Sequence, residues 1–410
     1  MEAHLQEWAN LLVRWIHMIT GIAWIGASFY FNFLENNLER EGKPQGIAGN
    51  LWAIHGGGFY FVEKYAVAPP KLPENLHWFK WEAYFTWITG FLLLGIVYYL
   101  NARTMMINPA VAELAPWQAV AIGIGTLVVA WLVYDNLCKL LGHKPVLLAG
   151  ILTVLLVALA WGLASVFSGR AAYIHVGAAI GTIMVANVFF VIIPSQKELV
   201  GAMREGRDPD PRYGKNGLLR SRHNNYLTLP VLFIMISNHF PSTYAAEWNW
   251  VILAALSVVS VLVRHYFNVR HLPGNRAWML PAAAVGFIAL VVATSPQLAN
   301  LFQDGKATAV AGAEGESGQA SATLEPVAFD RVTQIIEQRC ATCHAAEPTF
   351  SGYASPPAGI SLETAEQIRS HKADIDRVSV QSTYMPLGNI TKITDEERQT
   401  LEAWIVAGTK

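Results

Sequence analysis

The sequence predicts an all-α protein, a polytopic bundle of eight transmembrane helices followed by a small all-α domain. Hydrophobic residues make up 53% of the chain and charged residues only 14%, whereas a soluble domain carries about 25% charged residues. Residues 1–295 hold 20 Lys and Arg against 15 Asp and Glu, while residues 296–410 hold 9 against 15. Two parts of different composition are therefore joined, and no basic stripe favours a nucleic-acid partner.

The first part contains eight apolar stretches that are long enough to cross a membrane. A bilayer core about 30 Å thick requires roughly 20 apolar residues per helix. The first stretch has neither a basic leader nor a small-residue cleavage site, so we expect a retained helix and not a signal peptide. The sixth is short and contains Pro230. The stretches cover residues 9–33, 82–100, 117–138, 146–167, 172–193, 225–241, 248–266 and 278–295.

The positive charges between these stretches predict the orientation of the bundle. Lys and Arg accumulate in cytoplasmic loops. The loops after the first, third, fifth and seventh stretches hold 16 of them, whereas the loops after the second, fourth and sixth hold only Arg103 and Arg170. We therefore expect a multi-pass protein of a bacterial inner membrane, surrounded by lipid, with both termini in the periplasm.

The composition changes again after Pro296. Residues 297–326 are small, polar and poor in aromatic side chains, as is typical of a flexible tether. The remaining residues, 327–410, suffice for a small domain only if something besides a core stabilises it. The sequence thus predicts a transmembrane domain at residues 1–296, a periplasmic linker, and a C-terminal domain.

The strongest chemical signal is the run Cys340-Ala341-Thr342-Cys343-His344. Two thiols separated by two residues can form thioethers with the vinyl groups of one haem, and the adjacent histidine then becomes an axial iron ligand. A zinc knuckle would require a second cysteine pair, and a redox CxxC motif would require a thioredoxin-like context. The motif predicts a covalently attached haem c.

The flanking residues are typical of a class I-like cytochrome c. Residues 329–339 have the pattern of an amphipathic helix, and residues 394–407 begin with a Thr-x-x-Glu capping box. Met385 lies 41 residues after His344 and is the best candidate for the second axial ligand, with His371 as the rival. Because His/Met ligation raises the reduction potential of a haem, the domain is expected to accept electrons.

Histidines within the apolar stretches are functional candidates, because ionisable residues at membrane depth are rare. His17, His175 and His239 fall in the outer half of the predicted bundle. His17 and His175, on different helices, form the preferred pair for a second haem of the b type or a metal ion. The alternative is that each histidine only forms hydrogen bonds between helices.

A second polar cluster is predicted at the inner face. His55 precedes three glycines, which would allow a close approach of the backbone to a ligand, and Arg222, His223 and Asn224 lie in the run SRHNNY. Together they offer a cation, an acid or base and an amide, which suit a planar, hydrogen-bonding anion. The alternative is a positively charged membrane anchor with Asn caps, and Asp135 could pair with Arg264 nearby.

These features together resemble one family, the bacterial membrane-bound urate hydroxylases, in which a urate oxidase N-terminal membrane domain is fused to cytochrome c. The resemblance rests on the first helix (RWIHMITGIAWIG), the inner SRHNNYLTLP and the C-terminal CATCH. It implies oxidation of urate to 5-hydroxyisourate without peroxide formation. Electrons would pass to the haem and then to a soluble cytochrome c or a terminal oxidase.

Such a reaction suggests catalytic roles for the inner cluster. Arg222 would hold the charge of the urate anion, Asn224 its amide edge, and His55 or His223 would take a proton. A haem accepts one electron at a time, and a helix length is too far for one transfer, so His17 and His175 are expected to form a relay. If the substrate instead binds in the outer half, no relay is needed and these two histidines become the catalytic candidates.

A function without purine chemistry competes with this hypothesis. The first helix also looks like the histidine-bearing first helix of copper-import and cytochrome b-like membrane proteins. The chain would then transport a metal, or carry electrons from quinol to a periplasmic acceptor.

Overall fold

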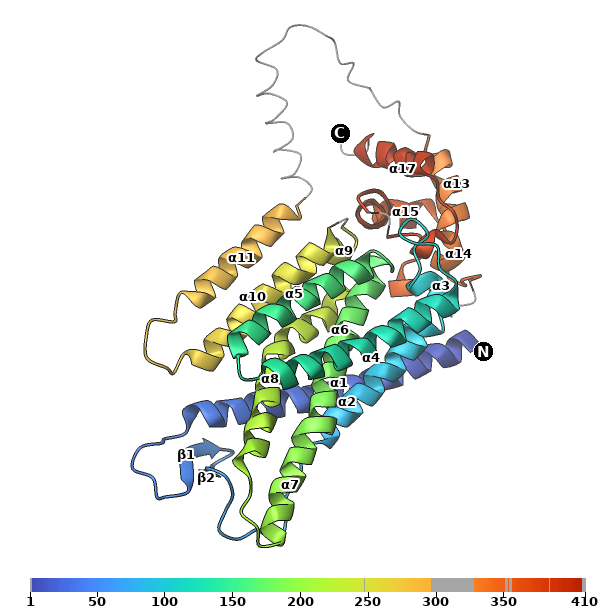
Figure 1. Ribbon diagram of the computed structural model, residues 1–410. Helices are drawn as coiled ribbons and strands as arrows, with labels where there is room; N and C mark the ends of the chain where they lie inside the picture. Colours follow the sequence, from blue (N-terminus) through green and yellow to red (C-terminus); the bar gives the residue numbers. More distant parts are fainter. Residues whose placement is uncertain are drawn as a thin grey trace.

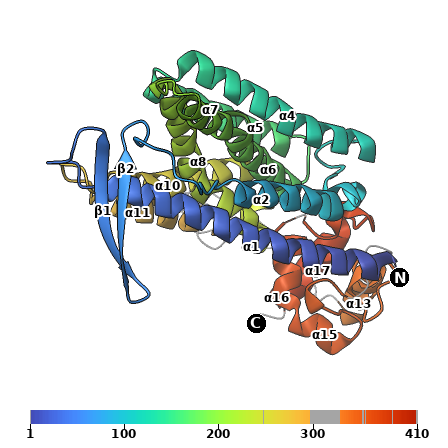
Figure 2. The same cartoon turned by 90° about the horizontal axis from the view of Figure 1, so that it is seen from below.

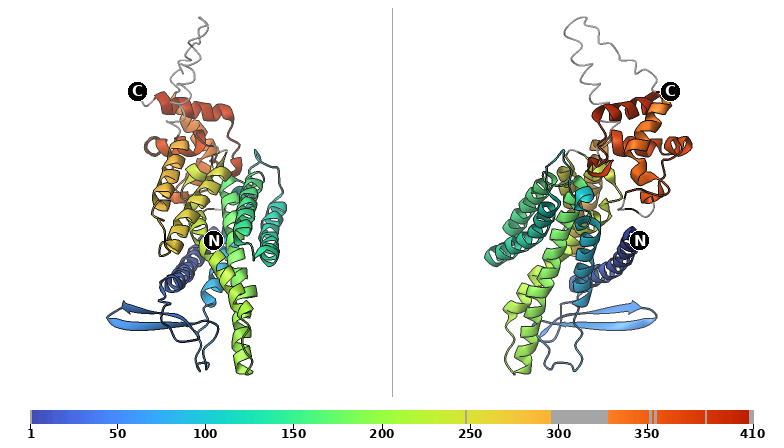
Figure 3. Two further views of the ribbon diagram at one scale, coloured as in Figure 1. Left: turned by 60° about the vertical axis from the view of Figure 1, so that its left-hand side comes forward. Right: turned by 90° about the vertical axis from the view of Figure 1, so that its right-hand side faces the viewer.

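A computed structural model describes residues 2–246, 248–295, 328–350, 353, 356–382 and 384–407. Helices run side by side in a bundle formed by residues 2–295, and a smaller helical unit, called here the C-terminal unit, is formed by the described residues from 328 onward (Figure 1). The C-terminal unit lies at one end of the bundle and the segment around residues 47–65 lies at the other (Figure 3). The mainly helical fold predicted from the sequence is confirmed.

The first helix, α1 (Glu2–Asn37), is longer than the predicted stretch 9–33. Its 36 residues correspond to about 54 Å at 1.5 Å per residue. It packs along α2 (Trp81–Leu93), and its N-terminus lies at the end of the bundle that carries the C-terminal unit (Figure 2). Trp8 and Trp15 are exposed on its surface, as expected for side chains that face lipid.

An antiparallel hairpin departs from the predicted all-α fold. Strand β1 (Ile47–His55) pairs with β2 (Gly58–Tyr65), so that Trp52 lies opposite Phe61. Gly56 and Gly57 form the turn with φ angles of 57° and 80°, the left-handed values that a two-residue hairpin turn requires. The glycines that the sequence suggested for ligand contact therefore serve the turn of this hairpin.

The next helices lead on from α2, and the short helix among them lies at the end of the bundle that carries the C-terminal unit. α2 continues as a π-helical segment, η1 (Leu94–Tyr99), and a short helix, α3 (Ala102–Met105), closes this end. Proline begins both following helices, α4 (Pro116–Leu141) and α5 (Pro145–Ala164), because its missing N–H costs nothing at the first helical position.

The centre of the bundle is α6 (Gly169–Ala186), in which twelve residues are buried. It continues through the π-helical η2 (Asn187–Ile192) into α7 (Ile193–Arg204), so the predicted stretch 172–193 belongs to a helix of 36 residues. α8 (Pro211–Ser237) begins 14 residues before the predicted start at residue 225. At Gly177 an added Cβ would lie 2.5 Å from Ile234, so glycine allows α6 and α8 to pack closely.

The bundle ends with α9 (Pro241–Tyr244), α10 (Asn249–Val269) and α11 (Met279–Ala293). Six helices of the described chain are long and apolar enough to cross a membrane. These six do not include α8, whose first half is polar, or α11, which has only 15 residues. The predicted linker, residues 297–326, lies outside the described residues.

The C-terminal unit has a core of its own. Val332, Ile336 and Leu401 are fully buried in it. Its first helix, α13 (Phe329–Arg339), has the bounds that the sequence predicts. Its other segments are α14 (Ala341–His344), η3 (Pro357–Gly359), α15 (Ala365–Ser370), α16 (Lys372–Ile375), η4 (Asp376–Val380), η5 (Leu387–Asn389) and α17 (Asp395–Ala407).

The predicted capping box at the start of α17 is confirmed. The backbone N–H of Thr394 donates to Glu397 Oε2 at 2.9 Å, and the N–H of Glu397 donates to Thr394 Oγ1 at 3.2 Å. Arg339 at the end of α13 forms an ion pair with the same carboxylate at 3.0 Å. This ion pair ties the first helix of the unit to the last.

Candidate functional site

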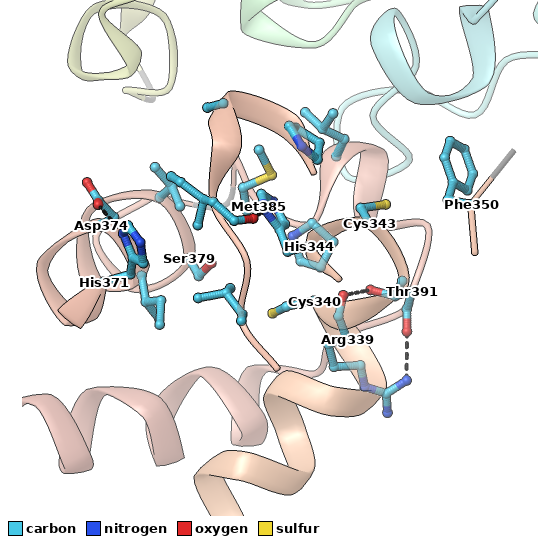
Figure 4. A pocket seen from close by; sticks show the side chains of 18 of the residues that line it. Arg339, Cys340, Cys343, His344, Phe350, His371, Asp374, Ser379, Met385 and Thr391 are labelled. Atoms are coloured by element: carbon cyan, nitrogen blue, oxygen red, sulfur yellow. Dashed lines mark hydrogen bonds and ion pairs between the residues drawn. The ribbon is translucent and has the colours of Figure 1, made fainter. Parts of the chain in front are cut away.

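The C-terminal unit contains a cavity of about 170 Å³ at the side that faces the bundle (Figure 4). Both cysteines and the histidine of the CATCH run line it, as do Met385 and Thr104, the latter from α3 of the bundle. Its walls are mainly apolar. They include Phe350, Ile360, Leu362, Ile375, Val378, Leu387 and Ile390.

One helical turn places the two thiols and the imidazole on the same wall. The backbone N–H groups of Cys343 and His344 both donate to the carbonyl oxygen of Cys340, at 3.1 and 2.9 Å. Burial raises the pKa of Cys340 to about 12 and also raises that of Cys343. Both sulfurs are therefore protonated thiols at neutral pH.

The described residues do not offer the remaining ligands of a zinc site. No group of three His, Cys, Asp or Glu side chains among them is arranged to hold a metal ion. The zinc alternative thus lacks ligands in the part of the chain that the structure describes.

A hydrogen bond to a backbone carbonyl orients the ring of His344. Its Nδ1 donates to the carbonyl oxygen of Ile360 at 2.9 Å, so Nε2 is the nitrogen that retains a lone pair. Burial is the largest influence on the pKa of His344 and lowers it. The ring is therefore neutral at pH 7, the form that can coordinate a metal.

The two candidates for a second axial ligand differ in their surroundings. Met385 lines the cavity, with its N–H bonded to the carbonyl oxygen of Val378 at 2.8 Å and its own carbonyl oxygen bonded to Arg398 at 3.0 Å. His371 also lines the cavity, but its Nδ1 lies 3.1 Å from Asp374 Oδ2. Figure 4 shows His371 beside Asp374, on the far side of Ser379 from the cysteines. Met385 has no such competing partner for its sulfur among the described residues.

The residue before Met385 joins the C-terminal unit to the bundle. The hydroxyl oxygen of Tyr384 accepts a hydrogen bond from Arg170 Nη1 at 3.2 Å, and its ring packs edge-on against Tyr244 at 5.2 Å between centroids. Arg170 lies at the start of α6, donates to Asn238 Oδ1 at 3.1 Å, and stands 5.9 Å from the ring of Tyr98.

A second contact lies at η5. Gly388 has a φ of 57°, and a Cβ added there would lie 3.0 Å from the carbonyl oxygen of Ile107 and 3.2 Å from that of Arg103. Only glycine allows this approach of the cavity's rim to α3. Arg103 and Arg170, the two exceptions in the predicted charge distribution, thus both lie at the contact with the C-terminal unit.

His17 and His175, the candidate pair within the bundle, lie at different contacts between helices. His17 on α1 forms a hydrogen bond of 3.0 Å between Nδ1 and Thr89 Oγ1 on α2. His175 on α6 is fully buried, and its Nδ1 donates to the carbonyl oxygen of Ala171 at 2.8 Å. His175 Nε2 has no partner and faces Gly123 of α4. The contacts of the two rings share no residue among those described.

At the opposite end of the bundle, Arg220 and not Arg222 is the buried arginine. Arg220 is 2% exposed and pairs with Asp135 at 2.7 Å, so the predicted pair of Asp135 with Arg264 is wrong. Arg222 points outward from the same helix and is exposed. A helical repeat of three to four residues groups Arg220 with His223 and Asn224 and excludes Arg222, a signal that the sequence already contained.

His223 and Asn224 are both engaged in a network with Asn187 and Tyr134. His223 Nδ1 lies 2.8 Å from the Tyr134 hydroxyl, which also accepts from Asn187. Asn224 accepts from Asn187 at 2.9 Å and donates to the carbonyl oxygen of Met184 at 2.9 Å. Both polar atoms of Asn224 therefore have protein partners.

His55 does not join this network. It is the last residue of β1 and is exposed beside the hairpin turn (Figure 2). The structure brings His223 and Asn224 together, as the sequence suggested, but it leaves His55 and Arg222 outside. Tyr384 was not found from the sequence, because nothing in a lone tyrosine before Met385 indicates a contact 214 residues away.

Comparison with known proteins identifies a family for the first part of the chain. No curated protein and no solved structure matches it. Residues 3–295, which include all helices of the bundle, match the family model described as urate oxidase N-terminal. The chain therefore belongs to the urate oxidase N-terminal family.

Proposed function

We propose that the protein is a membrane-bound, cytochrome-linked oxidoreductase that oxidises urate to 5-hydroxyisourate without forming peroxide. The family match of residues 3–295 supports urate as the substrate. The observation that carries the electron-transfer part is the contact between Tyr384, next to the candidate iron ligand Met385, and Arg170 of the bundle.

The cavity residues fit a covalent haem c. Two protonated thiols lie one turn apart, a neutral imidazole presents Nε2, and a thioether lines the same apolar space. When bound there, a haem supplies one-electron acceptance. Cys340 and Cys343 would hold it covalently, and His344 and Met385 would be its axial ligands.

The remaining residues at the contact hold the cavity against the bundle. Arg170 and Tyr384 fix the loop that carries Met385, and Gly388 allows α3 to approach its rim. Thr104 of α3 contributes directly to the cavity wall. Electrons leaving the bundle at this end would therefore have a short path to the candidate haem site.

The proposed topology contains eight spans, namely the six long apolar helices together with α8 and α11. An even number places the N-terminus and the C-terminal unit on the same side, in agreement with their positions in Figure 2. The excess of Lys and Arg in the opposite loops assigns this side to the periplasm of a bacterial inner membrane. A soluble cytochrome c or a terminal oxidase would take the electrons onward.

A relay within the bundle is part of the proposal. His17 and His175 each have Nδ1 engaged in a hydrogen bond, the arrangement found in metal-ligating histidines, whose Nε2 binds the ion. A second haem or a metal would use these two Nε2 atoms. If no such group binds and the substrate lies in the outer half, the buried Nε2 of His175, which has no hydrogen-bond partner among the described residues, is the candidate base.

The proposed function is tested by adding urate to the purified holoprotein without oxygen or quinol. Two electrons must leave each urate, so the reduced haem band should appear at up to two haems per urate, while 5-hydroxyisourate forms. A variant with Cys340→Ala and Cys343→Ala should bind urate but show no band. If urate leaves the wild-type haem oxidised while quinol reduces it, the protein is a quinol-linked carrier and the proposal is wrong.

A further inference from the structure

We propose that the bundle contains a binding site for a planar, hydrogen-bonding anion where α1, α8 and α10 meet, formed by Asn225, Arg264 and Asn268. The identification of this anion with urate rests on the proposed function. Asn225 belongs to the run SRHNNY that the sequence predicted at the inner face, whereas Asn268 was not among the candidates from the sequence.

Arg264 is a buried cation without an acidic partner. Arg264 is only 7% exposed. Its Nε donates to Asn225 Oδ1 at 3.0 Å, and its guanidinium carbon lies 4.1 Å from the centre of the Phe29 ring. No carboxylate pairs with it among the described residues, whereas Arg220 has Asp135. A buried charge is costly unless a counter-charge compensates it, so the site favours an anion.

The two asparagines have fixed orientations. Asn225 Oδ1 accepts from Arg264 Nε at 3.0 Å and from Asn268 Nδ2 at 2.7 Å. Rotating the Asn225 amide by 180° would place its Nδ2 against two donors, and rotating the Asn268 amide would place its Oδ1 against the oxygen of Asn225, so both orientations are fixed. As a result, Asn225 Nδ2 and Asn268 Oδ1 are buried and have no hydrogen-bond partner in the part of the chain that the structure describes.

These atoms define what the ligand must offer. It must bring negative charge for Arg264, an acceptor for Asn225 Nδ2 and an N–H or O–H donor for Asn268 Oδ1. Asn225 is only 1% exposed, so its unpaired amide is expensive unless a ligand satisfies it. The urate monoanion carries carbonyl oxygens and ring N–H groups around a flat ring. A lipid phosphate shares the charge and the acceptors, but its phosphodiester has no donor, so only a hydroxyl or amine of the headgroup would satisfy Asn268.

The position of the site suggests how the anion arrives. Arg264 lies 15 residues after Asn249, the first residue of α10, which corresponds to about 22 Å along the helix. The site is therefore close to the end of the bundle opposite the cavity, which the charge distribution assigns to the cytoplasm. We assign this site to the binding of an anion that enters from the cytoplasmic side. Electrons would still need the proposed relay at His17 and His175 to reach the cavity.

A neighbouring pair braces the same helix crossing. One residue further along each helix, the Tyr226 hydroxyl lies 2.7 Å from His265 Nδ1, and the two rings stack. This contact joins α8 and α10 without using Asn225 or Arg264. Loss of the arginine should therefore weaken ligand binding without separating the helices.

The test is equilibrium binding of radiolabelled urate to the full-length holoprotein in nanodiscs of neutral phosphatidylcholine. Arg264→Met removes the cation and should weaken binding at least tenfold. Asn268→Asp adds a carboxylate beside Arg264 and should weaken binding by a similar factor. The matched control is Arg204→Met, which removes an exposed cation at the end of α7 and should bind urate like the wild type. Size-exclusion chromatography of each variant reports whether the bundle is folded, because the haem spectrum would report only on the C-terminal unit, which has a core of its own.

The possible outcomes separate the site from the proposed function. If Arg264→Met binds urate as tightly as the wild type, the site is wrong, even when urate still reduces the haem. If wild-type binding depends on Arg264 but urate never reduces the haem, the site stands and the proposed function fails. If Arg264→Met loses co-purified phosphatidylglycerol while urate binding is unchanged, the occupant is a lipid phosphate and the assignment to a purine is overturned.

Discussion

Tyr384 and Met385 show how two adjacent residues can serve different parts of the protein. Met385 lines the cavity of the C-terminal unit, while Tyr384 accepts a hydrogen bond from Arg170 in the bundle. A hydrogen bond to a charged group contributes about 1.5–3 kcal/mol. The position of the candidate iron ligand is thereby linked to α6, the central helix of the bundle.

Tyr384→Phe should slow the reduction of the haem by urate about threefold to tenfold. The change removes the acceptor for Arg170 but keeps the ring that packs against Tyr244, so the contact should loosen without being lost. Stopped-flow absorption measures the rate, and a redox titration should show an unchanged midpoint potential. The matched control, Tyr60→Phe on the exposed hairpin, should reduce at the wild-type rate; a wild-type rate for Tyr384→Phe would show that the contact has no role in transfer.

Met385→Ala should shift the midpoint potential of the haem to lower values, because a thioether ligand raises it. The porphyrin should remain attached through Cys340 and Cys343. A spectroelectrochemical titration of the full-length protein measures the shift, and His371→Ala should leave the potential unchanged. The reverse pattern would assign the ligand position to His371.

At the scale of elements, contacts at helix ends hold the helices of the C-terminal unit together. The carboxylate of Glu397 caps α17 and pairs with Arg339 at the end of α13. These hydrogen bonds outweigh the effect of burial and hold the pKa of Glu397 below its ordinary value. A lowered pKa in the folded state contributes stability that is present above the unfolded pKa, about 4.3, and is lost as the pH falls through the folded value.

Glu397→Gln should destabilise the C-terminal unit by about 1–3 kcal/mol at pH 7, since it removes a charged partner of Arg339. Below pH 4 the difference from the wild type should shrink, because the wild-type carboxyl is then also becoming neutral. Thermal melting followed at the haem band measures both. Glu396→Gln, on the exposed side of the same turn, should melt like the wild type, and an equal loss in both variants would exclude a specific pair.

For the whole molecule, the proposed function assigns substrate binding and electron exit to opposite ends of the bundle. The C-terminal unit and the N-terminus lie at one end of the bundle, and α7 and the hairpin lie at the other (Figures 1 and 2). The site proposed at Arg264 lies toward the second end. The protein would thus bind its substrate on one side of the membrane and deliver electrons on the other.

This orientation can be measured with single cysteines in a chain whose Cys138 is replaced by serine. A cysteine introduced by Glu113→Cys, in the exposed connection before α4, should react with an impermeant maleimide on intact spheroplasts. One introduced by Asp208→Cys, between α7 and α8, should react only after permeabilisation. The opposite pattern would reverse the topology and place the haem cavity in the cytoplasm.

Local sequence patterns predicted the features that depend on neighbouring residues. The helix at 329–339 and the capping box at Thr394 are confirmed in their predicted positions, because amphipathic spacing and caps act within a few residues. The hairpin was missed. Its strands are rich in apolar residues, as the predicted helices are. Only the two turn glycines with positive φ distinguish the hairpin from a helix.

Which side chains pair between different helices could not be predicted from such local patterns. Asp135 pairs with Arg220 and not with Arg264, and Arg222 is exposed although it lies in the same run as Asn224. The exposure of Arg222 follows the helical repeat of α8 itself. The choice of Arg220 as the partner of Asp135 depends on the rotation of α8 relative to α4, which no pattern within one helix determines.

The sequence by itself determined a helical bundle with apolar stretches of membrane-spanning length, a cysteine pair with its histidine and the division of charge between the two ends, because apolar length, a five-residue motif and loop composition are local quantities. Only the tertiary structure decided that Tyr384 meets Arg170 and that Arg264 is buried with no acid beside it among the described residues. Such contacts join residues tens to hundreds of positions apart, and their free energy depends on packing that exists only once the helices have assembled.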